Sequence, residues 1–152
     1  MTTSRVGAVI DALVTTFSAG TSSDVLDGPS VRSSAAGTFA LVGGTLEESS
    51  VPIQQDWAGL GRNSRTEDGQ IPCAVVSQSG DSDDQAIKRH RDAALALVAE
   101  LEAAVAADPT LGGAVQAGWL HITSSDLVQS QNQNGSAVVI TITVSYRARL
   151  QS

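Results

Sequence analysis

The chain has 152 residues, and its 9 Lys and Arg against 16 Asp and Glu give a formal net charge of −7. This length favours a single domain over residues 1–152. The acidic balance argues against a protein around which nucleic acid wraps, because binding phosphates needs a positive surface. The single cysteine excludes a disulfide framework, and the lack of a long apolar run or secretory pattern excludes a membrane anchor, so we expect a cytoplasmically made protein.

An amphipathic helix is predicted near the N-terminus. Its apolar residues recur at helical spacing and share one face: Val6, Val9, Ile10, Leu13, Val14 and Phe17. Ser4 or Thr3 can cap the start of this helix, and Gly20 stands where a glycine would end it.

The middle of the chain has the pattern of strands and turns. Asp27-Gly28-Pro29 predicts a turn, and residues 38–42 predict a short strand. Residues 51–60 are expected to be extended, and residues 71–77 form another apolar strand. Residues 61–69 between them are polar and predict a loop, so the flanking segments form a long hairpin whose tip projects into solvent.

A second, alanine-rich helix is predicted from Ser82 to Asp108-Pro109. Ser82 and Gln85 have the spacing of a capping box, and Asp83 and Asp84 lie in the first turn, where the helix dipole favours acids. Proline ends the helix, because it disfavours helical geometry in the residue before it. The apolar stripe comprises Ile87, Ala94, Leu97, Val98, Leu101 and Val105.

Two strands follow, at residues 118–129 and 137–150. The second alternates between apolar and polar residues, as a half-buried strand does. Residues 131–136 contain Asn134-Gly135, a hairpin signal, in a loop longer than the minimum. The order of elements predicts an α+β fold: a mostly antiparallel sheet on which the N-terminal helix and the central alanine-rich helix pack.

No catalytic constellation is recognisable. His90 lies between two arginines on the polar helix face, where we expect it in solvent, and His121 is expected to pack beside a tryptophan. Cys73 sits in an apolar strand and is expected to be an inert core thiol. Asp81, Asp83 and Asp84 could be a cluster of carboxylates for a metal ion, but acidic residues are also favoured at the start of a helix, and we expect that role for them. We therefore expect a protein that is not an enzyme and that has no cofactor or metal.

The polar loop carries the first candidate interaction residues, Arg62, Asn63 and Arg65. They form either a solvated hairpin tip or a contact arm, in which arginine donates forked hydrogen bonds to a neighbour's carboxylates. Trp57, just before the loop, either anchors such a contact or closes the end of the core. Charged residues are only 16% of the chain, which leaves surface for protein contact.

The order of these elements resembles the tail terminator (tail-tube completion) proteins of long-tailed bacteriophages. The resemblance rests on the segment LVAELEAAVAADPTLGGAVQAGWLHIT, the glutamine-rich turn after it, and GSAVVITITVSYRARL, which contains Arg147 and Arg149. It implies a homo-oligomeric ring, commonly a hexamer, that caps the tail tube, ends its polymerisation and meets the head-side connector. Its location would be the virion, at the head–tail junction, with DNA passing through an acidic lumen without specific binding.

The residues allow other functions as well. A different head–tail joining protein or a tail-tube subunit would follow the same logic of assembly with different partners. A small-molecule-binding α+β domain would instead have a pocket beneath Trp57 or Trp119. The candidate interaction residues for the ring are Trp57, Arg62, Asn63, Arg65, Arg147 and Arg149.

Overall fold

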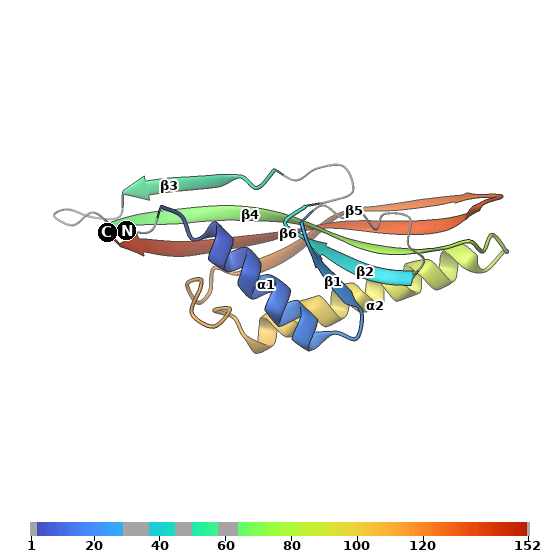
Figure 1. The fold of residues 1–152 in the computed structure, drawn as a ribbon, viewed down its shortest axis with the longest axis horizontal. Helices are drawn as coiled ribbons and strands as arrows, with labels where there is room; N and C mark the ends of the chain where they lie inside the picture. Colours follow the sequence, from blue (N-terminus) through green and yellow to red (C-terminus); the bar gives the residue numbers. More distant parts are fainter. Residues whose placement is uncertain (1–2, 29–36, 45–49, 58–63, 152) are drawn as a thin grey trace.

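A computed structural model describes residues 3–28, 37–44, 50–57 and 64–151. Two helices lie on one face of a long sheet, so the predicted α+β architecture is confirmed (Figure 1). The elements in chain order are α1 (Val6–Gly20), β1 (Asp24–Asp27), β2 (Gly37–Val42), β3 (Ile53–Trp57), β4 (Ser64–Ser79), α2 (Ala86–Ala107), β5 (His121–Asn132) and β6 (Gly135–Gln151).

The sheet is built around the long central pair β4 and β6. Its strand order is β1-β2-β4-β6-β5, and β3 pairs separately with β4. Residues 73–78 of β4 pair with β2 and residues 65–69 pair with β3, so β2 and β3 follow one another along the same edge of β4. Every pairing is antiparallel except that of β1 with β2, which confirms the predicted mostly antiparallel sheet.

The main core lies between the helices and the sheet. The predicted stripe of α1 is confirmed, because Val9, Leu13 and Phe17 are fully buried. Helix α2 packs close to α1: a Cβ added at Gly20 would lie 2.8 Å from the Cβ of Ala104. The alternation of β6 is also confirmed, since every second residue is buried on the helix side: Val138, Ile140, Ile142, Val144, Tyr146, Ala148 and Leu150.

Strand β4 begins earlier than predicted, and residues 64–69 of the expected polar loop 61–69 belong to the sheet. Residues 65–69 pair with β3 on one side and with β6 on the other, so their backbone groups are bonded in the ladder although their side chains are polar. Hydrophobic patterning cannot detect a strand of this kind. Arg65 therefore belongs to a strand and not to a hairpin tip, whereas Arg62 and Asn63 lie outside the described residues.

Helix α2 begins at Ala86, four residues after the predicted start at Ser82, and no capping box forms. The carboxylate of Asp83 accepts the backbone N–H of Gln85 at 2.9 Å and also binds Arg89. A local turn around Asp83 thus takes the place of the first helical turn. The predicted end of the helix at Asp108 is confirmed.

The β5–β6 hairpin is tighter than predicted. Asn132 pairs with Gly135, which leaves a loop of two residues, Gln133 and Asn134. Gly135 is the first residue of β6. A Cβ at this position would overlap the backbone of Ser79, so the close approach of the two strands requires a glycine. The loop is therefore the minimum one, and β5 begins at His121 instead of residue 118.

At one end of the sheet, β4 and β6 continue past β2 and β5 (Figure 1, left). There β4 lies between β6 on one side and β3 on the other and pairs with both. We call this three-stranded part the distal arm, made of Ile53–Trp57, residues 64–69 and residues 146–151. It includes most of the residues on which the functional hypothesis depends.

Candidate functional site

The distal arm brings four of the six predicted interaction residues together: Trp57, Arg65, Arg147 and Arg149. The pairing register puts them on two faces. Trp57 is opposite Arg65, and Arg65 is opposite Leu150, which is buried on the helix side. Arg147 and Arg149 alternate with the buried residues of β6 and therefore face away from the helices.

On the helix side, Trp57 is exposed over 70% of its surface, so it does not close the core. The guanidinium carbon of Arg65 lies 5.9 Å from the centre of the Trp57 ring, within the range of a cation–π contact. Arg65 also donates from Nη1 to Oε1 of Gln55 at 2.7 Å. The two residues thus present an ordered aromatic surface at the edge strand, the type of side chain that dominates protein interfaces.

Beneath this surface lies a buried carboxylate, Glu67. Its Oε1 accepts the Tyr146 hydroxyl at 2.7 Å and the backbone N–H of Arg5 at 3.1 Å, and its Oε2 accepts Nε2 of Gln55 at 2.7 Å. Burial alone would raise the pKa of Glu67, but these bonds and one from Ser4 hold that pKa below its usual range. Glu67 therefore ties the start of α1 to β3, β4 and β6.

On the opposite face, Arg147 is fixed between two partners. It donates to Asp68 from Nε at 2.7 Å and from Nη2 at 3.3 Å, and its guanidinium carbon lies 3.7 Å from the centre of the Trp119 ring. The hydrogen bond to Asp68 raises the pKa of Arg147, aided by the charges of Asp68 and Asp56. Arg149 is exposed, and its side chain has no hydrogen bond or ion pair with the described residues.

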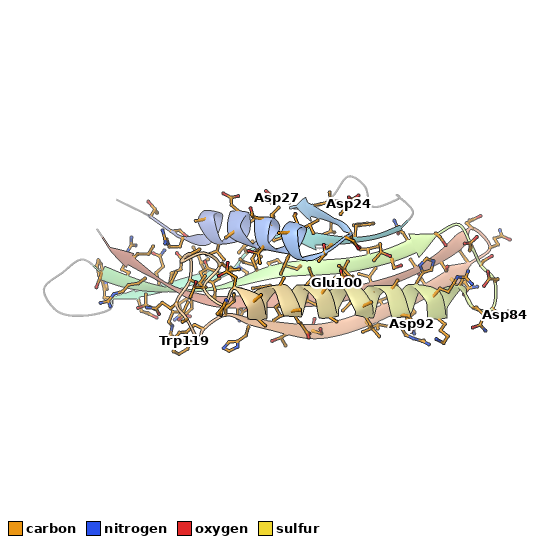
Figure 2. All side chains as sticks on the ribbon, turned by 90° about the horizontal axis from the view of Figure 1, so that it is seen from below. Asp24, Asp27, Asp84, Asp92, Glu100 and Trp119 are labelled. Atoms are coloured by element: carbon orange, nitrogen blue, oxygen red, sulfur yellow. The ribbon has the colours of Figure 1, made fainter. Side chains whose placement is uncertain are left out.

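A shallow hollow of about 390 Å³ lies beside this arginine–tryptophan pair. Its polar lining includes Gln54, Asp68, Gln70 and His121, and Trp119 lies at its margin with 46% of its surface exposed. Figure 2 shows Trp119 at the surface of the molecule. His121 lines the same hollow as Trp119, but it is exposed, so the expectation that it is a packed residue is wrong.

His90 is a residue whose role the sequence analysis missed. Its Nδ1 is hydrogen bonded to Ser77 Oγ at 2.8 Å, and its Nε2 to Ser79 Oγ at 2.9 Å. Thr38 Oγ1 continues this network at 3.0 Å from Ser77 Oγ. His90 is therefore half-buried between α2 and β4 rather than free in solvent. The two serines stand two residues apart on one face of β4, and this spacing was the available signal.

Cys73 is buried, and burial raises the pKa of its thiol to about 12, so it stays protonated at neutral pH. This confirms an inert core cysteine. Among the described residues, no group of three His, Cys, Asp or Glu could hold a metal ion. Asp83 is instead bound by Arg89 at 2.9 Å. None of the helices described here has the length and apolar character needed to cross a membrane.

The sequence matches no family model, and no curated protein matches it. Among the solved structures that resemble the chain is a component of the "Virion of native gene transfer agent (GTA) particle". The two are 13% identical with a TM-score of 0.41, and the similarity covers 97% of this chain and 100% of that chain. At this TM-score, the likeness by itself decides nothing about function.

Proposed function

We propose that the protein is a structural component of a phage-like virion. Within this class we propose a tail terminator, whose copies form a ring that caps the tail tube and meets the head-side connector. The resemblance implies a ring of six copies. Its partners would be further copies of itself, the tube protein and the connector protein, with DNA passing through the lumen.

The observation that carries this proposal is the distal arm. Trp57 stands 70% exposed on an edge strand, with Arg65 ordered beside it. Strand β3 pairs only with β4 among the described strands, so its outer edge is available for another chain. Exposed edges promote aggregation unless a partner covers them, and an assembling subunit uses them for contact. The quoted C-terminal segments that resemble tail terminators form α2, β5 and β6.

A tube-capping assay tests the proposal. Tube protein is allowed to polymerise with and without this chain, and tube lengths are measured by electron microscopy. We expect shorter, capped tubes, and we expect Trp57→Ser to raise the concentration needed for capping about tenfold or more, because an exposed tryptophan anchor is lost. Leu95→Ser, an exposed apolar residue on α2, is the matched control and should cap normally.

The same assay separates the other virion functions. A tail-tube subunit would polymerise on its own, and a head–tail joining protein would leave tube length unchanged while binding a connector. Either result would overturn the terminator assignment and keep the broader class of virion component.

The hollow beside Trp119 supports a second candidate, a small-molecule-binding domain. Its volume of about 390 Å³ and its amide, carboxylate and imidazole lining would suit a small polar ligand. Quenching of tryptophan fluorescence by a metabolite, lost in Trp119→Phe and retained in Trp57→Phe, would favour this function.

A further inference from the structure

The distal arm has two open edges, one on each side. On one side β3 pairs only with β4 among the described strands. On the other side, the pairing of β6 with β5 stops at Ser145, and Gln116 then donates its backbone N–H to the carbonyl of Arg147 at 2.8 Å. Beyond this bond, residues 148–151 of β6 pair with β4 on their inner side, and on their outer side no described strand pairs with them.

The two edges carry opposite charges in the same row of the sheet. Asp56 is opposite Thr66, and Thr66 is opposite Arg149, so the three side chains form one cross-strand row. Asp56 and Arg149 are both exposed, and both point to the face away from the helices. The row thus begins with an acid at one edge and ends with a base at the other.

The next row repeats this arrangement. Gln54 is opposite Asp68, and Asp68 is opposite Arg147. Its edge on the β3 side therefore presents a side-chain amide, and its edge on the β6 side presents an arginine. An amide oxygen and a guanidinium group can hydrogen bond. Asp68 and Trp119 already hold the Arg147 side chain, however, and Gln116 occupies its carbonyl, so the complementary pair left exposed at the two edges is Asp56 with Arg149.

We propose that copies of this chain join head to tail at the distal arm, with β3 of one copy added to the outer edge of residues 148–151 in the β6 strand of the next, and with Asp56 beside the next copy's Arg149. This inference rests on the proposed function, because it specifies the contact between ring subunits. The occupant of each edge is a second copy of the same chain.

Strand direction follows from the topology. Strand β3 runs antiparallel to β4, and β4 runs antiparallel to β6, so β3 and β6 point the same way. A junction that repeats the same step keeps this direction, and β3 therefore pairs with the next copy's β6 in parallel. Such a contact is heterologous, and it closes into a ring when the rotation per copy divides a full turn.

Charge exchange tests the inference. In Asp56→Arg and in Arg149→Asp, like charges meet at every junction, so we expect self-association to weaken about fivefold per junction. The double variant Asp56→Arg with Arg149→Asp restores opposite charges, and we expect it to associate as the unmodified chain does. Sedimentation velocity over a concentration series measures this. Failure of the double variant to recover, while each single variant stays folded by circular dichroism, would overturn the inference.

Asp126→Arg is the matched control. Asp126 is exposed on β5, which pairs with β6 outside the distal arm, and its substitution makes the same change in charge. Strand β5 also exposes Val128 over 58% of its surface, so it is the competing edge. Normal assembly of Asp126→Arg supports the distal arm, whereas loss of assembly in this variant alone would assign the junction to β5 and overturn the inference.

Cross-linking gives an independent test. Within one copy, Asp56 and Arg149 are separated by two strand spacings, about 10 Å, whereas a disulfide needs Cα atoms within about 7 Å. Asp56→Cys with Arg149→Cys should therefore form a ladder of covalent oligomers on non-reducing gels, whereas each single variant has no cysteine opposite it at the junction and should stay monomeric on the same gel. Buried Cys73 does not interfere. Absence of a ladder under conditions of association, or no association even with tube protein present, would overturn the inference.

The two proposals fail differently. A ladder without tube capping would retain the junction and reject the terminator function. Capping that is unaffected by charge reversal at Asp56 or Arg149 would retain the function and reject this junction.

Discussion

At the scale of single residues, Glu67 shows how this chain places a charge where pattern analysis expects a loop. Among the described residues it is the fully buried carboxylate, and β3, β6 and the start of α1 each donate a hydrogen bond to it. A buried charge costs free energy unless hydrogen bonds satisfy it. Here they do, and Glu67 stabilises the arm on which both proposals rest.

The pH dependence of stability follows from this site. The pKa of Glu67 is lower in the folded protein than its ordinary value of 4.5. The unfolded chain therefore takes up this proton more readily, so the stabilisation is present above about pH 5 and is lost as pH falls through the folded value. We expect the free energy of unfolding to fall as the pH drops below about 5, and Glu67→Gln to flatten part of that slope in urea titrations.

At pH 7, Glu67→Gln should also be less stable by about 1–3 kcal/mol, because hydrogen bonds to a charged acceptor are replaced. Glu102→Gln is the control: this residue is exposed on α2, and the same chemical change there should leave stability and its pH profile nearly unchanged. An identical pH profile for both variants would contradict the assigned role of Glu67.

At the scale of elements, the sequence patterns predicted the helices and strands that bury a regular apolar face. Periodicity located α1 and the alternation of β6, because each of them buries a regular apolar face, and Asp108-Pro109 located the end of α2. Residues 64–69 were missed because their strand is held by ladder pairing on both sides and by the polar contacts of Glu67. The site was predicted in part: arginines and an exposed tryptophan were identified, but their grouping depends on this hidden strand.

The β4–β6 pairing in the arm depends on a glycine. Gly69 is opposite Tyr146, and a Cβ at position 69 would overlap the tyrosine ring, which therefore lies directly over the glycine backbone. We expect Gly69→Ala to destabilise the protein by about 1–3 kcal/mol through overpacking, measured by urea denaturation. Gly80→Ala is the control, since a Cβ there meets nothing within 4 Å. Equal stability of the two variants would contradict this close packing.

At the scale of the whole molecule, the arm and the helix-covered part share one core. Tyr146 and Ala148 in the arm belong to the same buried cluster as Leu13 of α1 and Leu101 of α2. Arg5, at the start of α1, is also bonded to Glu67. Continuous burial of this kind favours a single cooperative unit, which is what one domain over residues 1–152 requires.

Cooperativity can be measured because the two probes report on different parts. Trp119 lies against Arg147 in the arm, whereas the far-ultraviolet circular dichroism signal of helices comes from α1 and α2. In the variant Trp57→Phe, which leaves Trp119 as the only tryptophan, we expect the fluorescence and dichroism transitions in urea to share one midpoint and one slope. A fluorescence transition at lower urea would show that the arm unfolds before the helices. In that case the arm unfolds as a separate unit, and the edges proposed for assembly belong to the less stable part of the protein.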